Sequence, residues 1–153
     1  MKKYGKFYFP RKKVKLNNNA NPVTDSTDNS AHENGSVLIV EDDHFIATAL
    51  QIKLQKAGIH VQVASNGTEG LKELEKAKYD LILLDIMMPG IDGWEVLSQI
   101  KQKSIQTKVL VTSNLSQEED KQKAKELGAL DFLIKSDTSL LVIVDTVKRY
   151  LTM

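Results

Sequence analysis

The sequence contains no cysteine and no long apolar run, and these two absences narrow the classes of protein to which it can belong. Without cysteine, neither disulfides nor thiolate-bound metal sites can form. No apolar run approaches the roughly 20 residues that a membrane-spanning helix needs. The triplet FYF near the N-terminus is too short to be the core of a secretory signal. We therefore expect a cytoplasmic protein without a transmembrane segment.

The net charge is also small, +1 over 153 residues, but the charges are unevenly distributed along the chain. Residues 1–35 hold seven Lys/Arg and three Asp/Glu, whereas the rest of the chain holds fourteen and seventeen. The stretch NNNANPVTDSTDNSAHENGS nearly lacks large apolar side chains, so it cannot offset the entropy of ordering. We predict a disordered, basic and polar tail over 1–35 and a domain over 36–153. Weak contact of KKYGKFYFPRKKVK with anionic lipid or nucleic acid is the less favoured alternative to a solvated leader.

Short apolar runs alternate with segments of helical periodicity throughout the predicted domain. The runs predict five strands, at Val37–Val40, His60–Ala64, Leu81–Leu84, Lys108–Thr112 and Ala129–Ile134. The periodic segments predict five helices, at 44–58, Thr68–Lys78, 93–102, 116–128 and Ser139–Leu151. Five strands that alternate with five helices indicate a parallel sheet covered on both faces.

Helix ends and inward faces are also marked in the sequence. Residues that suit the N-cap position precede three helices: Asp43, Asp92 and Ser116. Glycines follow the first and the fourth helix, at Gly58 and Gly128. Glu95 stands three residues after Asp92, the spacing of a capping box. We expect inward apolar side chains on the first two helices at Phe45, Ala49, Ile52 and Leu54, and at Leu71 and Leu74.

The fold class that follows is α/β, a flavodoxin-like three-layer sandwich. Right-handed crossovers and the size of the chain favour the strand order 2-1-3-4-5. The first, third and fourth strands are apolar throughout and so should be buried on both faces. His60–Ala64 alternates polar and apolar residues, which is typical of an edge strand.

Carboxylates follow two strands that this topology makes neighbours. The first strand ends in Glu41, Asp42 and Asp43, and the third ends in Asp85. Ligands bind beyond the carboxyl ends of such strands, where the strand order reverses. Clustered carboxylates must shift their pKa values, pair with a cation or bind a metal. Oxygen ligands without His or Cys favour a hard cation such as magnesium.

The other strand ends carry groups that suit phosphate. Thr112 and Ser113 end the fourth strand, and Lys135 ends the fifth. A carboxylate can act as the nucleophile that forms an aspartyl phosphate. Taken singly, each residue has a simpler interpretation as a turn residue, a solvated lysine or a β-branched strand residue, and for Asp43 we accept the role of helix cap. All the strand ends together favour a phosphate site.

Four segments resemble the receiver domain of two-component response regulators, the CheY-like family: VLIVEDD, DLILLDIMMPGIDGWEVL, VLVTS and GALDFLIKS. The resemblance covers roughly residues 36–153. It implies that Asp85 accepts a phosphoryl group from a sensor histidine kinase or phosphotransfer protein, with Mg²⁺ or Mn²⁺ as cofactor. It also implies that the fourth helix, fifth strand and fifth helix form a face that changes and signals to a downstream protein.

The resemblance assigns roles to individual residues. It implies a metal site made by Glu41 acting through water, Asp42, Asp85 and the backbone carbonyl of Met87. It implies catalytic and switch roles for Thr112, a phosphoryl contact for Lys135 and a switch aromatic at Phe132. Pro89-Gly90 and Asp92-Gly93 would shape the loop that turns the Met87 carbonyl toward the ion.

Four positions depart from the family pattern: Ser136, Ser113 in place of a smaller residue, Glu41 in place of aspartate, and Phe132 in place of the frequent tyrosine. Ser136 replaces the proline that usually follows the lysine, and because a cis bond without proline costs roughly 3 kcal/mol we expect a trans peptide there. Met87 is apolar and cannot orient an attacking water, so we expect slow self-dephosphorylation.

Two other interpretations stay open beside a phosphorylated regulator. One is a degenerate receiver that binds proteins without phosphorylation. The other is a hydrolase of external phosphoesters, although Met87 stands where that chemistry needs a second aspartate. We expect no enzymatic activity beyond self-phosphotransfer and slow autodephosphorylation. After Lys135 there is room for one helix, so we expect no DNA-binding domain and no direct DNA binding. A phosphorylation-dependent homodimer is left open.

Overall fold

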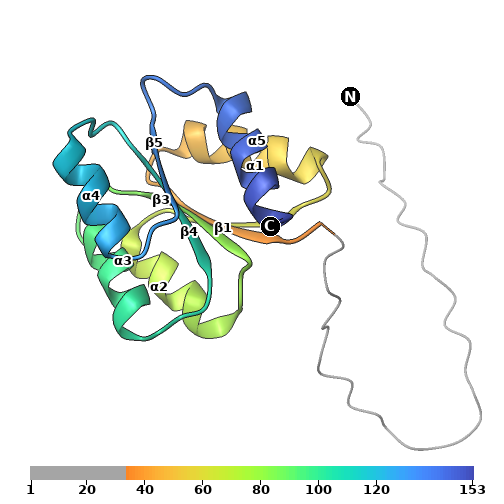
Figure 1. Ribbon diagram of the computed structural model, residues 1–153. Helices are drawn as coiled ribbons and strands as arrows, with labels where there is room; N and C mark the ends of the chain where they lie inside the picture. Colours follow the sequence, from red (N-terminus) through yellow and green to blue (C-terminus); the bar gives the residue numbers. More distant parts are fainter. Residues whose placement is uncertain (1–33) are drawn as a thin grey trace, which may run out of the picture. The chain divides into compact units, whose positions relative to one another are not determined.

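The computed structural model describes residues 34–153, which form alternating strands and helices (Figure 1). The strands are β1 (Ser36–Val40), β2 (His60–Ala64), β3 (Leu81–Asp85), β4 (Lys108–Ser113) and β5 (Asp131–Ile134). The helices are α1 (His44–Lys56), α2 (Gly67–Lys76), α3 (Gly93–Gln102), α4 (Glu118–Glu126) and α5 (Leu140–Leu151). The tail predicted for 1–35 lies, except for its last two residues, outside the described residues. None of the helices within 34–153 has the length and apolar character to cross a bilayer.

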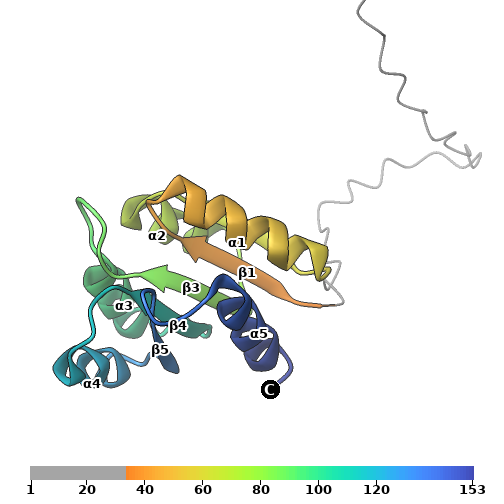
Figure 2. The ribbon, with the colours of Figure 1, turned by 90° about the horizontal axis from the view of Figure 1, so that it is seen from above.

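All five strands pair in parallel, in the order β2-β1-β3-β4-β5. Helices α1 and α5 cover one face of the sheet, and α2, α3 and α4 cover the other (Figure 1; Figure 2 gives the view from above). The predicted flavodoxin-like sandwich and its strand order are confirmed, and β2 lies at an edge as expected. The order reverses between β1 and β3, so the carboxyl ends of these neighbouring strands meet at the switch point.

The central strands divide their side chains between two apolar clusters. Val37 and Ile39 of β1 pack with α1 and α5, whereas Leu38 and Val40 pack on the side of α2, α3 and α4. All four are fully buried. Because both faces of the sheet are covered, β1 has no polar face before its carboxyl end. The polar site therefore begins where the strand stops.

Four of the predicted helix ends are confirmed. The Asp43 side chain accepts hydrogen bonds from the backbone N–H groups of Phe45 and Ile46, and Asp92 accepts one from Glu95 N–H. Gly58 and Gly128 have φ of +79° and +101°, the left-handed conformation that ends a helix.

The cap predicted at Ser116 is wrong. Helix α4 begins at Glu118, and its N-cap residue is Gln117, which makes no side-chain capping bond. The serine stands one residue too early to reach the free N–H groups of the first turn. The strand predicted at Ala129–Ile134 is also shorter than expected, because it begins at Asp131.

The inward face predicted for the first helix is wrong for two of its residues. Phe45 and Ile52 are 85% and 46% exposed, and the buried positions are Ala47, Leu50 and Leu54. At 3.6 residues per turn, Phe45 and Ile52 lie about half a turn away from this buried stripe. Leu54 was predicted correctly. On α2, Leu71 is buried and Leu74 packs against the core, as predicted.

Gly93, the first residue of α3, allows that helix to start directly against the end of β3. A Cβ atom at Gly93 would lie 2.2 Å from the backbone oxygen of Asp85 and 2.6 Å from the Cα of Ile86. No side chain fits in this space. The close approach fixes α3 to the strand end that carries Asp85.

We predict that Gly93→Ala destabilises the protein by about 1–3 kcal/mol, the usual cost of overpacking, because backbone atoms must move to admit the methyl group. Urea denaturation would measure the loss. Gln102→Ala, an exposed change in the same helix, is the control and should stay within about 0.5 kcal/mol. Equal stability of the two variants would contradict this account of the β3–α3 contact.

Candidate functional site

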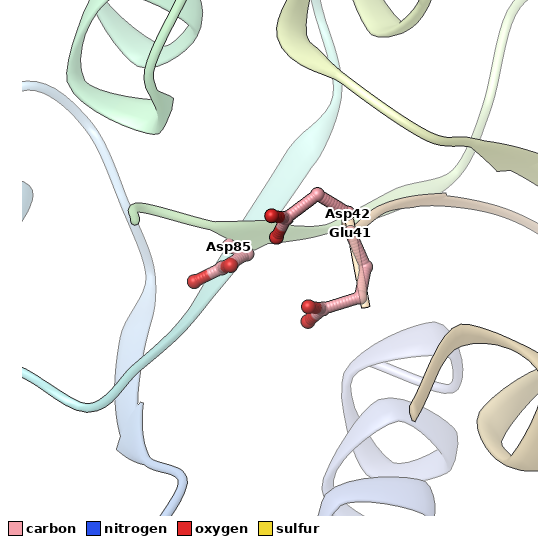
Figure 3. Close-up of side chains that lie close together, drawn as sticks. All are labelled: Glu41, Asp42 and Asp85. Carbon is pink, nitrogen blue, oxygen red and sulfur yellow. The ribbon is translucent and has the colours of Figure 1, made fainter. Parts of the chain in front are cut away.

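Three carboxylates converge at the carboxyl ends of β1 and β3. Glu41, Asp42 and Asp85 each offer an oxygen atom, and these atoms lie within 4.8 Å of one another (Figure 3). Glu41 and Asp85 are each 3% exposed, whereas Asp42 is open to solvent. The sequence-predicted acidic cluster is therefore assembled by the fold, with two buried members and one accessible member.

Lys135, which follows β5, contacts both buried carboxylates. Its Nζ lies 2.6 Å from Glu41 Oε2 and 3.3 Å from Asp85 Oδ2. The shorter contact is with Glu41, not with the residue predicted to be the nucleophile. The single positive charge of Lys135 faces three carboxylates, so the cluster keeps an excess of negative charge.

Burial, more than the neighbouring negative charge, raises the pKa values of the two buried carboxyl groups. Burial raises the pKa of Asp85 above its ordinary value; the Lys135 charge and the Met87 N–H oppose the rise, and the Asp42 charge adds to it. Burial also raises the pKa of Glu41, against the hydrogen bond from Lys135. Burial by itself lowers the pKa of Lys135, but its hydrogen bond to Glu41 and the charges of Asp85 and Glu41 outweigh this and raise it. A second cation would relieve the remaining repulsion.

Backbone N–H groups hold two of the carboxylates in place. Asp43 N–H donates to Glu41 Oε1 at 3.2 Å, and Met87 N–H donates to Asp85 Oδ1 at 3.2 Å. Each carboxylate therefore has one oxygen on a backbone donor and the other toward Lys135. The atoms that could bind a metal are carboxylate oxygens, which lie close together and are only partly neutralised by Lys135. This set of ligands fits a hard divalent cation.

The predicted hydroxyl and aromatic residues lie on the neighbouring strands. Thr112 is 2% exposed and stands opposite Asp85 in the β3–β4 register. Phe132 is partly buried and packs in the cluster under α2, α3 and α4, so it is not part of the acidic site. The Met87 side chain is 59% exposed. The Lys135–Ser136 peptide is trans, as expected, because residues 34–153 contain no cis bond.

The sequence analysis missed the part that Ser113 plays in the loop after β4. Ser113 is fully buried, and its Oγ accepts a hydrogen bond from Leu115 N–H at 3.2 Å. A hydroxyl that bonds the backbone two residues later is a recognised local turn. This pattern could have identified the contact from the sequence.

Comparisons with known proteins agree with this geometry. The family model for the response regulator receiver domain matches residues 37–145. The alkaline phosphatase synthesis transcriptional regulatory protein PhoP of Bacillus subtilis is 41% identical over 102 residues, which are 67% of this chain and 42% of that protein. The transcriptional regulatory protein PcoR of Escherichia coli is 39% identical over 99 residues, 65% of this chain and 44% of that protein. The chain thus spans less than half the length of these relatives.

Solved structures are similar over most of the described residues. The Francisella response regulator 1452 receiver domain has a TM-score of 0.74 and 32% identity, and the match covers 78% of this chain and 98% of that one. The response regulator TrrA from Thermotoga maritima, solved in complex with Mg(2+)-BeF, has a TM-score of 0.66 and 31% identity, over 75% of this chain and 97% of that one.

We predict that Mg²⁺ raises the melting temperature, and does so more at pH 8 than at pH 5.5. A ligand present at 100 times its Kd stabilises the folded state by about 2.7 kcal/mol. The pKa values of Asp85 and Glu41 are raised in the folded protein. Their ionised forms therefore oppose folding above the raised pKa, and this cost disappears as pH falls through it. Because Mg²⁺ needs the ionised forms, its effect shrinks at low pH.

Thermal melts with and without Mg²⁺ at the two pH values measure the effect. Asp42→Asn should reduce the Mg²⁺-dependent shift strongly, whereas Asp137→Asn, an exposed change outside the cluster, should leave it intact. A shift that is the same in both variants would place the ion elsewhere.

Proposed function

This chain belongs to the response regulator receiver domain family, and we propose that Asp85 accepts a phosphoryl group from a phosphohistidine of a sensor kinase or phosphotransfer protein. The observation that carries the proposal is the meeting of Asp85, Glu41, Asp42 and Lys135 at one end of the sheet. The relatives are longer than this chain, so the proposal concerns the receiver domain alone.

Asp85 is the carboxylate best placed to act as nucleophile. One of its oxygens attacks the phosphorus atom, the P–N bond to the imidazole breaks, and the bonding electron pair stays on the imidazole nitrogen. Because the other nitrogen of the phosphohistidine ring carries a proton, the ring leaves as neutral imidazole, and Asp85 becomes an acyl phosphate. Lys135, 3.3 Å from Asp85 Oδ2, supplies positive charge beside the transferred group.

Asp42, Asp85 and the Met87 backbone carbonyl would hold Mg²⁺ or Mn²⁺, with Glu41 acting through water. The bound ion would neutralise charge on the phosphoryl oxygens. The acidic cluster supports this assignment, as does the TrrA structure with Mg(2+)-BeF. Glu41 also keeps Lys135 in the site before transfer, because its Oε2 is the nearer partner of the ammonium group.

The new phosphoryl group changes the partners of two nearby residues. Its oxygens accept a hydrogen bond from the Thr112 hydroxyl and draw Lys135 away from Glu41. In this proposal, movement of Thr112 on β4 gives Phe132 on the adjacent β5 space to rotate; Thr112 lies opposite Leu133, the residue after Phe132. The face formed by α4, β5 and α5 then shifts toward a second packing that a downstream protein recognises.

We predict that acetyl phosphate with Mg²⁺ adds one phosphoryl group to the wild-type protein and none to Asp85→Asn. The amide cannot act as the nucleophile, although it keeps the shape of the side chain. Intact-mass measurement detects the addition, and Asp137→Asn is the control that should be modified normally. Modification of Asp85→Asn would move the nucleophile elsewhere. A wild-type protein that binds Mg²⁺ without modification would favour the phosphorylation-independent binding module.

We further predict that Met87→Asn shortens the lifetime of the acyl phosphate, by up to about 100-fold, the lower end of what a positioned polar group contributes to proton transfer. The exposed methionine cannot hydrogen-bond an attacking water, whereas an amide can. Decay of the phosphorylated protein after removal of acetyl phosphate gives the rate. Met87→Leu keeps an apolar side chain and should decay like the wild type. An unchanged rate in Met87→Asn would exclude this role.

A further inference from the structure

Helix α4 is weakly anchored by apolar contacts. Of its nine residues, Glu118–Glu126, only Ala124 is buried, and the N-cap Gln117 makes no capping bond. By contrast, α3 buries Val96, Leu97 and Ile100. A helix with so little buried apolar surface needs other contacts to stay in place.

Two lysine contacts join α4 to α3. Lys123 Nζ lies 4.2 Å from the centroid of the Trp94 ring, a cation–π contact. Lys101 Nζ donates a hydrogen bond to the backbone oxygen of Glu126 at 2.6 Å. That oxygen belongs to the last residue of α4, where carbonyl groups lack partners within the helix. Each lysine therefore ties the C-terminal half of α4 to the neighbouring helix.

Open space lies on both sides of α4. A hollow of about 540 Å³ on the α3 side is lined by residues of both helices and of the loop before α3, among them Trp94, Lys123 and Leu127. A second hollow of about 400 Å³, lined by Ala124, Leu130 and Phe132 among others, lies toward β5. A shift of α4 therefore needs little repacking of the core, and it alters the space around Phe132.

Helix α3, which lies beside α4, and helix α5, on the opposite face of the sheet, are held more firmly. Gly93 seats α3 against the backbone of Asp85. The Tyr150 hydroxyl of α5 donates to Asp131 Oδ2 at 3.3 Å, and Lys108 Nζ donates to the Tyr150 backbone oxygen at 2.6 Å. The element of the signalling face with the least anchorage is thus α4.

We propose that Lys123 and Trp94, supported by Lys101, form a latch that holds α4 against α3 and opposes the packing that follows phosphorylation. This regulation rests on the function proposed above. Lys123 and Trp94 are positioning residues, because they act through α4 and Phe132 and contact no reacting atom. Coupling is reciprocal, so a weaker latch must strengthen phosphoryl-group binding by the same factor.

Hydrogen exchange of the α4 amides, without any phosphodonor, tests whether the latch holds the helix. Lys123→Met removes the charge but keeps the apolar stem, and exchange should become about two- to five-fold faster, the factor expected for a cation–π contact at an exposed site. Lys123→Arg keeps the cation and should match the wild type. Lys125→Met, a matched change in the same turn, should also match it. Equal rates for both methionine variants would overturn the latch.

Binding of beryllofluoride with Mg²⁺ tests the coupling, with the fluorescence of Trp94, the one tryptophan of the chain, as the signal. Lys123→Met should bind beryllofluoride about two- to five-fold more tightly than the wild type, the same factor that is expected for the exchange rate. Equal affinities would overturn the regulatory role. If the wild-type protein took no phosphoryl group from acetyl phosphate, the proposed function would fail, and the exchange comparison would still decide whether the latch holds α4.

Discussion

The burial of two like-charged carboxylates beside one lysine is the constraint on which the rest of the structure depends. Removing an ionised carboxylate from water costs several kcal/mol even after relaxation, and only close partners offset this. Glu41 and Asp85 each have a backbone donor at 3.2 Å and share Lys135, at 2.6 and 3.3 Å. The shared ammonium cannot balance both carboxylates and Asp42. The resting site is thus left with an excess of carboxylate oxygen atoms, a ligand set that fits a hard divalent cation.

The rest of the fold must offset the free energy that is needed to bury these carboxylates. Strands β1 and β3 are buried from end to end, and their side chains belong to two separate apolar clusters. The contact of Gly93 with the backbone of Asp85 and Ile86 then fixes the loop that follows Asp85. The buried charges lie at the strand ends, where the sheet cannot relax without losing contacts on both faces. The apolar strands and the polar site are therefore two consequences of one topology.

Most of the fold and the acidic cluster could be predicted from the sequence because they depend on local patterns and on parallel-sheet topology. Apolar runs marked the strands, and once β1 and β3 are neighbours, Glu41, Asp42 and Asp85 must meet. Contacts that depend on helix rotation or side-chain reach could not be predicted. Phe45 is apolar but lies half a turn from the buried stripe of α1, and Lys135 Nζ lies nearer to Glu41 than to Asp85. The assigned role of the Met87 carbonyl stays a prediction.

The sequence periodicity predicts only that α4 is a helix. The contacts that α4 makes with neighbouring residues explain why its composition is so polar. An apolar face on α4 would lock it onto the sheet, whereas one buried alanine and two lysine contacts leave its position adjustable. Segments with few buried apolar contacts open at low free energy and are the ones that respond to ligands. Thr112 pairs with Asp85 across β3 and β4, and Phe132 lies on the next strand beside α4. The proposed switch would therefore need to pass only from Asp85 through the adjacent strands β4 and β5 to reach α4.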